Sequence, residues 1–131
     1  MIDKKEMVKL VVEFNLRHGY LLHGTSMVMH GVKDQTNNID IFIHTKYIDR
    51  LKFSSKKAQK FDFGFGSVRN TIDYVLIDGF QCQTLESIIK EKRQLGRPKD
   101  LEAIELIEAF IAKDNLPKSC QSIYRKVVMD C

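Results

Sequence analysis

A small-residue turn followed at once by a short apolar helix constrains this chain more than any other feature. The turn is His23-Gly24-Thr25-Ser26, and the expected helix runs from Met27 to His30, where Gly31 ends it. A glycine turn that opens a helix can hold a phosphate through backbone N–H groups and the helix dipole. This half of the segment therefore predicts an anion site.

The other half is a polar loop, Lys33 to Asn37, and then a strand, Asn38 to His44. Asn38 and Asp40 alternate with isoleucines, so both polar side chains leave one face of the strand. Oxygen ligands spaced in this way can hold a divalent metal beside a bound phosphate. Together the two halves predict a nucleotide site.

The remaining sequence predicts helices and two further strands. Apolar residues recur at helical spacing near the N-terminus, with Asp3 as a capping residue and Gly19 as the terminating glycine. The predicted elements are a helix over about Lys4–His18, a short helix over Thr45–Leu51, strands over Lys60–Gly66 and Asn70–Ile77, a turn at Asp78-Gly79, and helices over Thr84–Gln94, Pro98–Lys113 and Gln121–Val128. This order predicts an α+β fold, with a small mixed β-sheet covered by helices.

Length and composition bound the class of protein. A chain of 131 residues is expected to form a single domain, 1–131, and 44% hydrophobic with 29% charged residues is typical of a soluble globular protein. The net charge of +4 suits an anionic ligand or a nucleic acid without deciding between them. No apolar run is long enough for a membrane helix, and the N-terminus lacks the apolar core of a signal peptide. Three scattered cysteines form no disulfide framework, which predicts reduced thiols and a cytoplasmic protein.

The segment HGTSMVMHG, residues 23–31, with TNNID, residues 36–40, resembles the signature of the nucleotidyltransferase fold of the DNA polymerase β type. It is similar to small bacterial members, such as the lincosamide nucleotidyltransferases and the toxin-like nucleotidyltransferases. The resemblance covers residues 21–110, and it implies a minimal nucleotidyltransferase fold. His23 stands where the first glycine is usual, and Asn38 where the first aspartate is usual.

The resemblance also implies the roles of site residues. Asn38, Asp40 and Asp73 would be the metal ligands for Mg²⁺ or Mn²⁺, with Asp40 and Asp73 catalytic and Asp62 a rival for the third position. Phosphates would be held by His23, Gly24, Thr25 and Ser26. The hydroxyls of Thr25 and Ser26 could equally cap the helix, and His30 is expected to be structural.

A second motif, KRQLGRPKDLEAI over Lys92–Ile104, is similar to a basic motif of the same family. Lys92, Arg97 and Lys99 would be cations near the phosphates, with Asp100 fixing one of them. The alternative for these residues is an ordinary solvated helix junction.

The resulting hypothesis is an enzyme that transfers a nucleoside monophosphate from an NTP to a hydroxyl acceptor with Mg²⁺. The acceptor could be a small molecule, a tRNA or a protein, and the sequence does not define an oligomeric state. The alternative is a catalytically degenerate member that binds a nucleotide or a protein partner without turnover, because Asn38 brings no charge to the metal.

Overall fold

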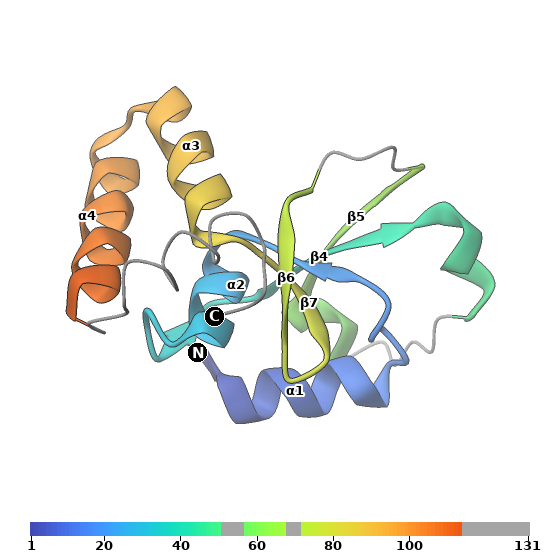
Figure 1. The fold of residues 1–131 in the computed structure, drawn as a ribbon. Coiled ribbons are helices and arrows are strands. Elements are labelled where there is room, and N and C mark those ends of the chain that lie inside the picture. Colours follow the sequence, from blue (N-terminus) through green and yellow to red (C-terminus); the bar gives the residue numbers. More distant parts are fainter. Residues whose placement is uncertain (51–56, 68–71, 114–131) are drawn as a thin grey trace.

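A mixed five-stranded sheet forms the centre of the computed structural model, which describes residues 1–50, 57–67 and 72–113 (Figure 1). The strand order is β5-β4-β2-β7-β6, where β2 is Tyr20–Leu21, β4 is Ile39–His44, β5 is Phe61–Gly66, β6 is Tyr74–Ile77 and β7 is Phe80–Gln83. β4 pairs in parallel with β5, and β2 with β7, whereas the β2–β4 and β6–β7 pairs are antiparallel. Two short strands, β1 (Ile2–Asp3) and β3 (Gln35–Thr36), pair separately. The predicted α+β class with a mixed sheet is confirmed.

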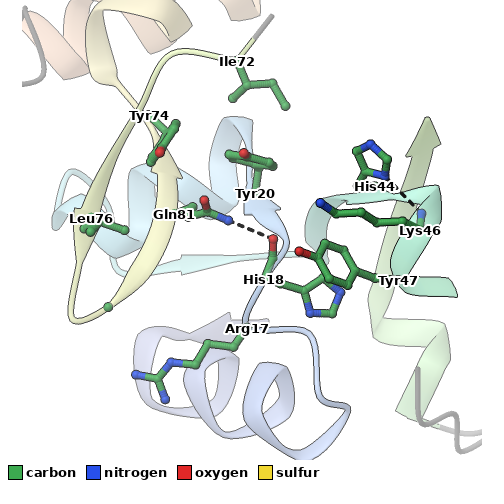
Figure 2. A pocket seen from close by; sticks show the side chains of 11 residues that line it. Arg17, His18, Tyr20, His44, Lys46, Tyr47, Ile72, Tyr74, Leu76 and Gln81 are labelled. Carbon is green, nitrogen blue, oxygen red and sulfur yellow. Dashed lines mark hydrogen bonds between the residues drawn. The ribbon is translucent and has the colours of Figure 1, made fainter. Parts of the chain in front are cut away.

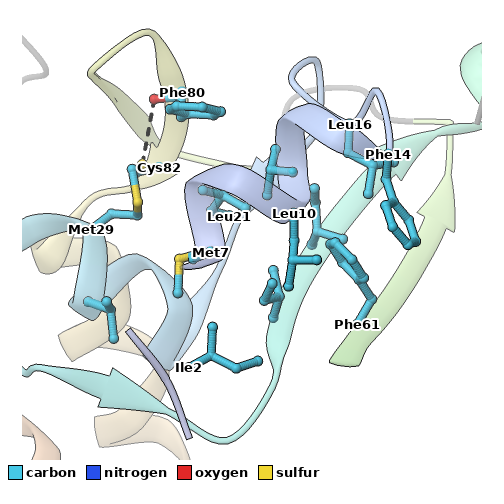
Figure 3. Close-up of a cluster of buried hydrophobic side chains, with 14 of the residues drawn as sticks. Ile2, Met7, Leu10, Phe14, Leu16, Leu21, Met29, Phe61, Phe80 and Cys82 are labelled. Carbon is cyan, nitrogen blue, oxygen red and sulfur yellow. Dashed lines mark hydrogen bonds between the residues drawn. The ribbon is translucent and has the colours of Figure 1, made fainter. Parts of the chain in front are cut away.

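Helix α1, Lys4–Glu13, covers one face of this sheet. Asp3 caps it by accepting a hydrogen bond from the Glu6 N–H at 2.9 Å, as the sequence predicts. The main core lies between α1 and the sheet and includes the aromatic ring of Phe14 (Figure 3). The helix ends earlier than predicted, because Asn15 takes a left-handed φ of 58° and turns the chain.

Helix α2, His23–His30, begins directly after β2 and ends at Gly31, which has a φ of 89°. The four residues predicted as a turn are therefore its first helical turn. Helices α3 (Leu85–Leu95) and α4 (Pro98–Lys113) pair beside the sheet around a second cluster that includes Met27 of α2 (Figure 1). Thr84 caps α3 and Gly96 ends it, which confirms both predictions.

Strand β7 was not predicted, although the preceding turn was. Asp78 and Gly79 both have positive φ, as a two-residue hairpin turn requires, so β6 folds back directly into β7. The segment from Thr45 forms a 3₁₀ helix, Thr45–Arg50, and a second one spans Lys57–Lys60. The predicted final helix over 121–128, and the predicted elements within 51–56 and 68–71, lie outside the described residues.

Strand register divides the sheet into two faces. Leu21 pairs with Ile41 and with Cys82, and these buried side chains belong to the core beneath α1. Tyr20 pairs with Phe42 and with Gln81, so these side chains occupy the opposite face. Because side chains alternate, Asp40 and His44 share the face of Phe42.

Within the described ranges, none of the helices has the length and apolarity needed to cross a membrane.

Candidate functional site

Two buried hydroxyls fix α2 against the sheet. Thr25 Oγ1 donates to the Asn38 carbonyl at 3.2 Å and accepts the Asp40 N–H at 2.7 Å. Ser26 Oγ donates to the Gln83 carbonyl at 2.6 Å. Both residues are 0% exposed. The structure therefore gives Thr25 and Ser26 an anchoring role and does not turn their hydroxyls toward a ligand, in contrast to the phosphate-binding role that the resemblance implies.

His23 lies between two carboxylates at the start of α2. Its Nε2 is 3.2 Å from Glu91 Oε2, and its Nδ1 is 3.8 Å from Asp40 Oδ2. The Asp40 carboxylate raises the pKa of His23, Glu91 adds to this effect, and partial burial opposes it. The arrangement favours an imidazolium, a positive charge directly beside the helix N-terminus.

Lys33 brings a second cation to the same place. A Cβ added at Gly24 would lie 3.0 Å from Lys33 Nζ and 3.3 Å from Thr36 Oγ1, so the glycine lets the ammonium approach the backbone of α2. Burial lowers the pKa of Lys33, the nearby charge of Lys92 lowers it further, and Asp40 acts in the opposite direction. Lys33, Lys92 and Asp40 thus lie close enough to interact.

The oxygen ligands of the strand gather on β4 and β5. Asp40 pairs in register with Asp62, and the Asn38 amide nitrogen donates to Asp62 Oδ2 at 3.2 Å. Asp40 is partly accessible, with 28% of its side chain exposed, and Asp62 is exposed. Asp62, the rival residue in the sequence analysis, is therefore the carboxylate that the structure places opposite Asp40.

Asp73 lies elsewhere. It precedes β6, where its carbonyl accepts the Thr84 N–H at 3.0 Å, and β2 and β7 separate β6 from β4. Three strand spacings correspond to roughly 14 Å. The expectation that β4 and β6 belong to one sheet is confirmed, but the structure does not bring Asp73 to Asn38 and Asp40.

A buried carboxylate organises the basic motif. Asp100, with no exposed side-chain area, accepts from Arg97 Nε at 2.6 Å and lies 3.5 Å from Lys92 Nζ. The Arg97 guanidinium holds the pKa of Asp100 at about 2, well below its usual range. Asp100 therefore fixes Lys92 and Arg97, in agreement with the role expected for it, whereas Lys99 is exposed in the first turn of α4.

Gln83 connects these parts and was missed from the sequence. Only 2% exposed, it accepts the His23 N–H at 2.9 Å and donates to Ser87 and to the Glu91 carboxylate. Its carbonyl is also 2.9 Å from His30 Nε2, and burial lowers the pKa of His30 to about 4, so a neutral His30 donates this bond. The structural role predicted for His30 agrees with these contacts. Recognition of strand β7 would have pointed to Gln83.

Comparisons with protein-family models, with curated proteins and with solved structures found no match to this chain.

Proposed function

We propose that this protein binds a nucleoside triphosphate beside Asp40 and transfers its nucleoside monophosphate to a hydroxyl acceptor. The observation that carries the proposal is the meeting of oxygen ligands and cations at the start of α2. Asn38, Asp40 and Asp62 supply the oxygen ligands. The cations beside them are His23, Lys33 and Lys92.

The backbone at His23 adds support. Its φ of 51° lies in the left-handed region, which glycine adopts without strain. This backbone conformation is a physical reason for the glycine that the nucleotidyltransferase signature usually carries where this chain has His23. His23 substitutes a charged ring that can contact a phosphate.

The oxygen ligands fit Mg²⁺ or Mn²⁺ delivered with a triphosphate. Mg²⁺ prefers oxygen ligands and commonly takes one or two protein carboxylates together with substrate phosphates. The described part of the chain contains no cluster of three or more His, Cys, Asp or Glu side chains suited to a metal, so the phosphates would have to complete the coordination. Asp40 and Asp62 would hold the ion with the Asn38 amide oxygen. A bound ion would neutralise triphosphate charge.

In the proposed reaction, the acceptor hydroxyl oxygen attacks the α-phosphorus. The bond from that phosphorus to the bridging oxygen of the β-phosphate breaks, and pyrophosphate leaves. Asp62, exposed and opposite Asp40, accepts the hydroxyl proton. His23, Lys33 and Lys92 stabilise the charge on the phosphates, with Arg97 held nearby by Asp100.

One observation favours the second function, nucleotide binding without turnover. Lys33 and His23 already place positive charge around Asp40, and the Asn38 amide is engaged by Asp62. Fixed cations can bind a triphosphate without a metal ion.

Two measurements test the proposal. Calorimetry with an NTP and Mg²⁺ should show binding that weakens about tenfold or more in Lys92→Ala, because a charge-assisted contact contributes about 1.5–3 kcal/mol. Lys90→Ala, an exposed lysine on the same helix, is the matched control and should bind as the wild type.

Transfer of label from NTPs to small-molecule, tRNA and protein acceptors then separates the two functions. Asp40→Asn should abolish transfer, and Asp49→Asn, at an exposed site in the 3₁₀ helix, should retain it. NTP binding with no transfer to any acceptor would favour the degenerate function. An absence of NTP binding would refute both.

A further inference from the structure

A pocket separate from the residues around Asp40 lies on the face of the sheet opposite α1, at the end of β4 away from Asp40. It has a volume of about 580 Å³ and is lined by 11 residues (Figure 2). Small-molecule sites commonly enclose about 300–1,000 Å³. His44 lines this pocket and shares the face of Asp40, four residues and roughly 13 Å further along the strand.

All three tyrosines of the described chain line this pocket. Tyr20 comes from β2, Tyr47 from the 3₁₀ helix and Tyr74 from β6, so three separate elements bring them together. Tyr20 and Tyr74 meet edge to face, with ring centroids 5.3 Å apart. Tyr74 remains 38% exposed, so its ring is available to a ligand. The pocket thus presents aromatic surface that can stack on a planar group.

The same pocket is cationic. None of its lining residues is acidic, whereas Arg17 and Lys46 are basic. The Arg17 guanidinium packs 4.8 Å from the centre of the Phe80 ring, so Lys46 is the cation turned into the pocket (Figure 2). Lys46 Nζ lies 5.0 Å from the centre of the Tyr47 ring, and Figure 2 shows both side chains turned toward the space between Tyr20 and His18. The nearby Asp78 carboxylate is 3.1 Å from Lys4 Nζ, which offsets its charge.

Polar groups at the pocket are held in fixed orientations. His44 Nδ1 accepts the Lys46 N–H at 3.0 Å, so a neutral His44 carries its proton on Nε2. Gln81 donates from its amide nitrogen to the His18 carbonyl at 2.8 Å, which fixes the amide plane at the pocket wall. Such groups can hydrogen-bond the edge of a base.

From these features we infer that the pocket binds a nucleotide, with the base stacked on Tyr74 and the phosphate against Lys46. Stacking on aromatic rings together with basic side chains is the usual means of binding single-stranded nucleic acid, and the same chemistry suits a free nucleotide. The site is built from residues separate from those around Asp40. The inference therefore holds whether or not the protein catalyses transfer.

Calorimetry with AMP, with a five-nucleotide RNA and with inorganic phosphate tests this inference. Tyr74→Ala should weaken AMP and RNA binding by about tenfold, the scale of one lost base-stacking contact. Tyr74→Phe keeps the ring and should bind nearly as the wild type. Lys46→Ala should weaken binding and lower the salt dependence of RNA affinity by about 0.7 in the log–log slope, as expected for one lost phosphate contact. Lys9→Ala, an exposed lysine on α1, is the control.

The outcomes distinguish an RNA strand from a free nucleotide as the ligand, and this pocket from the Asp40 site as the place where it binds. RNA bound much more tightly than AMP identifies a strand, and similar affinities identify a free nucleotide; both support the inference when the pocket variants weaken them. Phosphate bound as tightly as AMP would overturn it, since the base would then contribute nothing. Binding lost in Lys92→Ala but unchanged in folded Tyr74→Ala and Lys46→Ala would assign the nucleotide to the Asp40 site and overturn this inference alone. No binding of either nucleotide would also overturn it.

Discussion

His23 shows how much one residue at the site depends on its surroundings. Its backbone takes a left-handed φ of 51°, and its ring is held between Asp40 and Glu91. A non-glycine residue in this conformation costs on the order of 1 kcal/mol. The charged contacts of the ring offset part of that cost only while the imidazole is protonated.

The protonation of His23 predicts a pH-dependent stability. Because Asp40 and Glu91 raise its folded pKa above 6.5, the ion pairs stabilise the protein fully below the unfolded pKa, and this stability is lost as the pH rises through the raised folded value. His23→Gln should therefore lower the melting temperature more at about pH 5.5 than at about pH 8.5. With 43% of the side chain exposed, the difference should stay below about 1 kcal/mol.

Salt provides the control for this prediction. At about 1 M salt the Debye length falls to about 3 Å, so the pH-dependent difference between wild type and His23→Gln should shrink. An equal loss at both pH values would mean that the ring acts only by packing.

A substitution at Asn38 distinguishes the two proposed functions, nucleotidyl transfer and nucleotide binding without turnover. Asn38→Asp replaces an amide that donates to Asp62 with a carboxylate that faces Asp62 and neighbours Asp40. Repulsion among three carboxylates should lower the melting temperature without Mg²⁺. In an active enzyme, Mg²⁺ should restore stability, bind more tightly and raise transfer, which thermal melts and label transfer would measure. A variant that Mg²⁺ does not rescue, with no transfer in either form, would favour the degenerate function.

At the scale of elements, α2 is positioned by hydrogen bonds to two strands. Thr25 links it to β4 at the residues Asn38 and Asp40, and Ser26 links it to β7. Because the Thr25 and Ser26 side chains are fully buried, the start of the helix and the Asp40 backbone behave as one unit. The Thr25 and Ser26 hydroxyls therefore contribute to the site by holding α2 in place rather than by contacting a ligand.

Thr25→Val tests this coupling, since valine matches the shape of threonine but leaves the Asp40 N–H, which faces the fully buried Thr25 side chain, without its acceptor. An unsatisfied buried group costs about 1–3 kcal/mol, so the free energy of unfolding should fall by that amount in urea denaturation. Thr45→Val, at an exposed position, should change it by less than about 0.5 kcal/mol. Equal stability of the two variants would contradict the anchoring role of Thr25.

At the scale of the whole molecule, close packing between the segment after α1 and the sheet fixes how the layers meet. A Cβ added at Gly19 would lie 2.7 Å from side-chain carbons of Ile41 and Ile43, both fully buried in the main core. These atoms cannot move without disturbing the packing beneath α1. Gly19, expected from the sequence to end the first helix, instead permits this approach.

Gly19→Ala should therefore destabilise the protein by about 1–3 kcal/mol through overpacking. Gly64→Ala is the matched control, because a Cβ there would meet Phe42 at an ordinary 3.4 Å. Chemical denaturation of both variants measures the difference. A Gly19→Ala variant as stable as Gly64→Ala would show that the core adapts to the methyl group.

The sequence by itself determined most of the local structure. Alternating isoleucines predicted β4, apolar spacing predicted α1, α3 and α4, and Asp3, Gly31, Thr84 and Gly96 marked helix ends correctly. The side chains of Asp100, Arg97 and Lys92 were also grouped correctly, because they belong to one continuous motif. These features depend on residues close together in the chain.

Only the tertiary structure decided which distant side chains meet. Sheet order put Asp62 opposite Asp40 and left Asp73 two strands beyond β2, and no local pattern encodes that order. The contacts of His23 with Gln83 and Glu91 span 60 and 68 residues, and the three tyrosines of the pocket come from separate elements. Strand pairing and core packing place such groups together. Both depend on the burial of apolar faces across the whole chain, whereas the spacing within one segment sets only local structure.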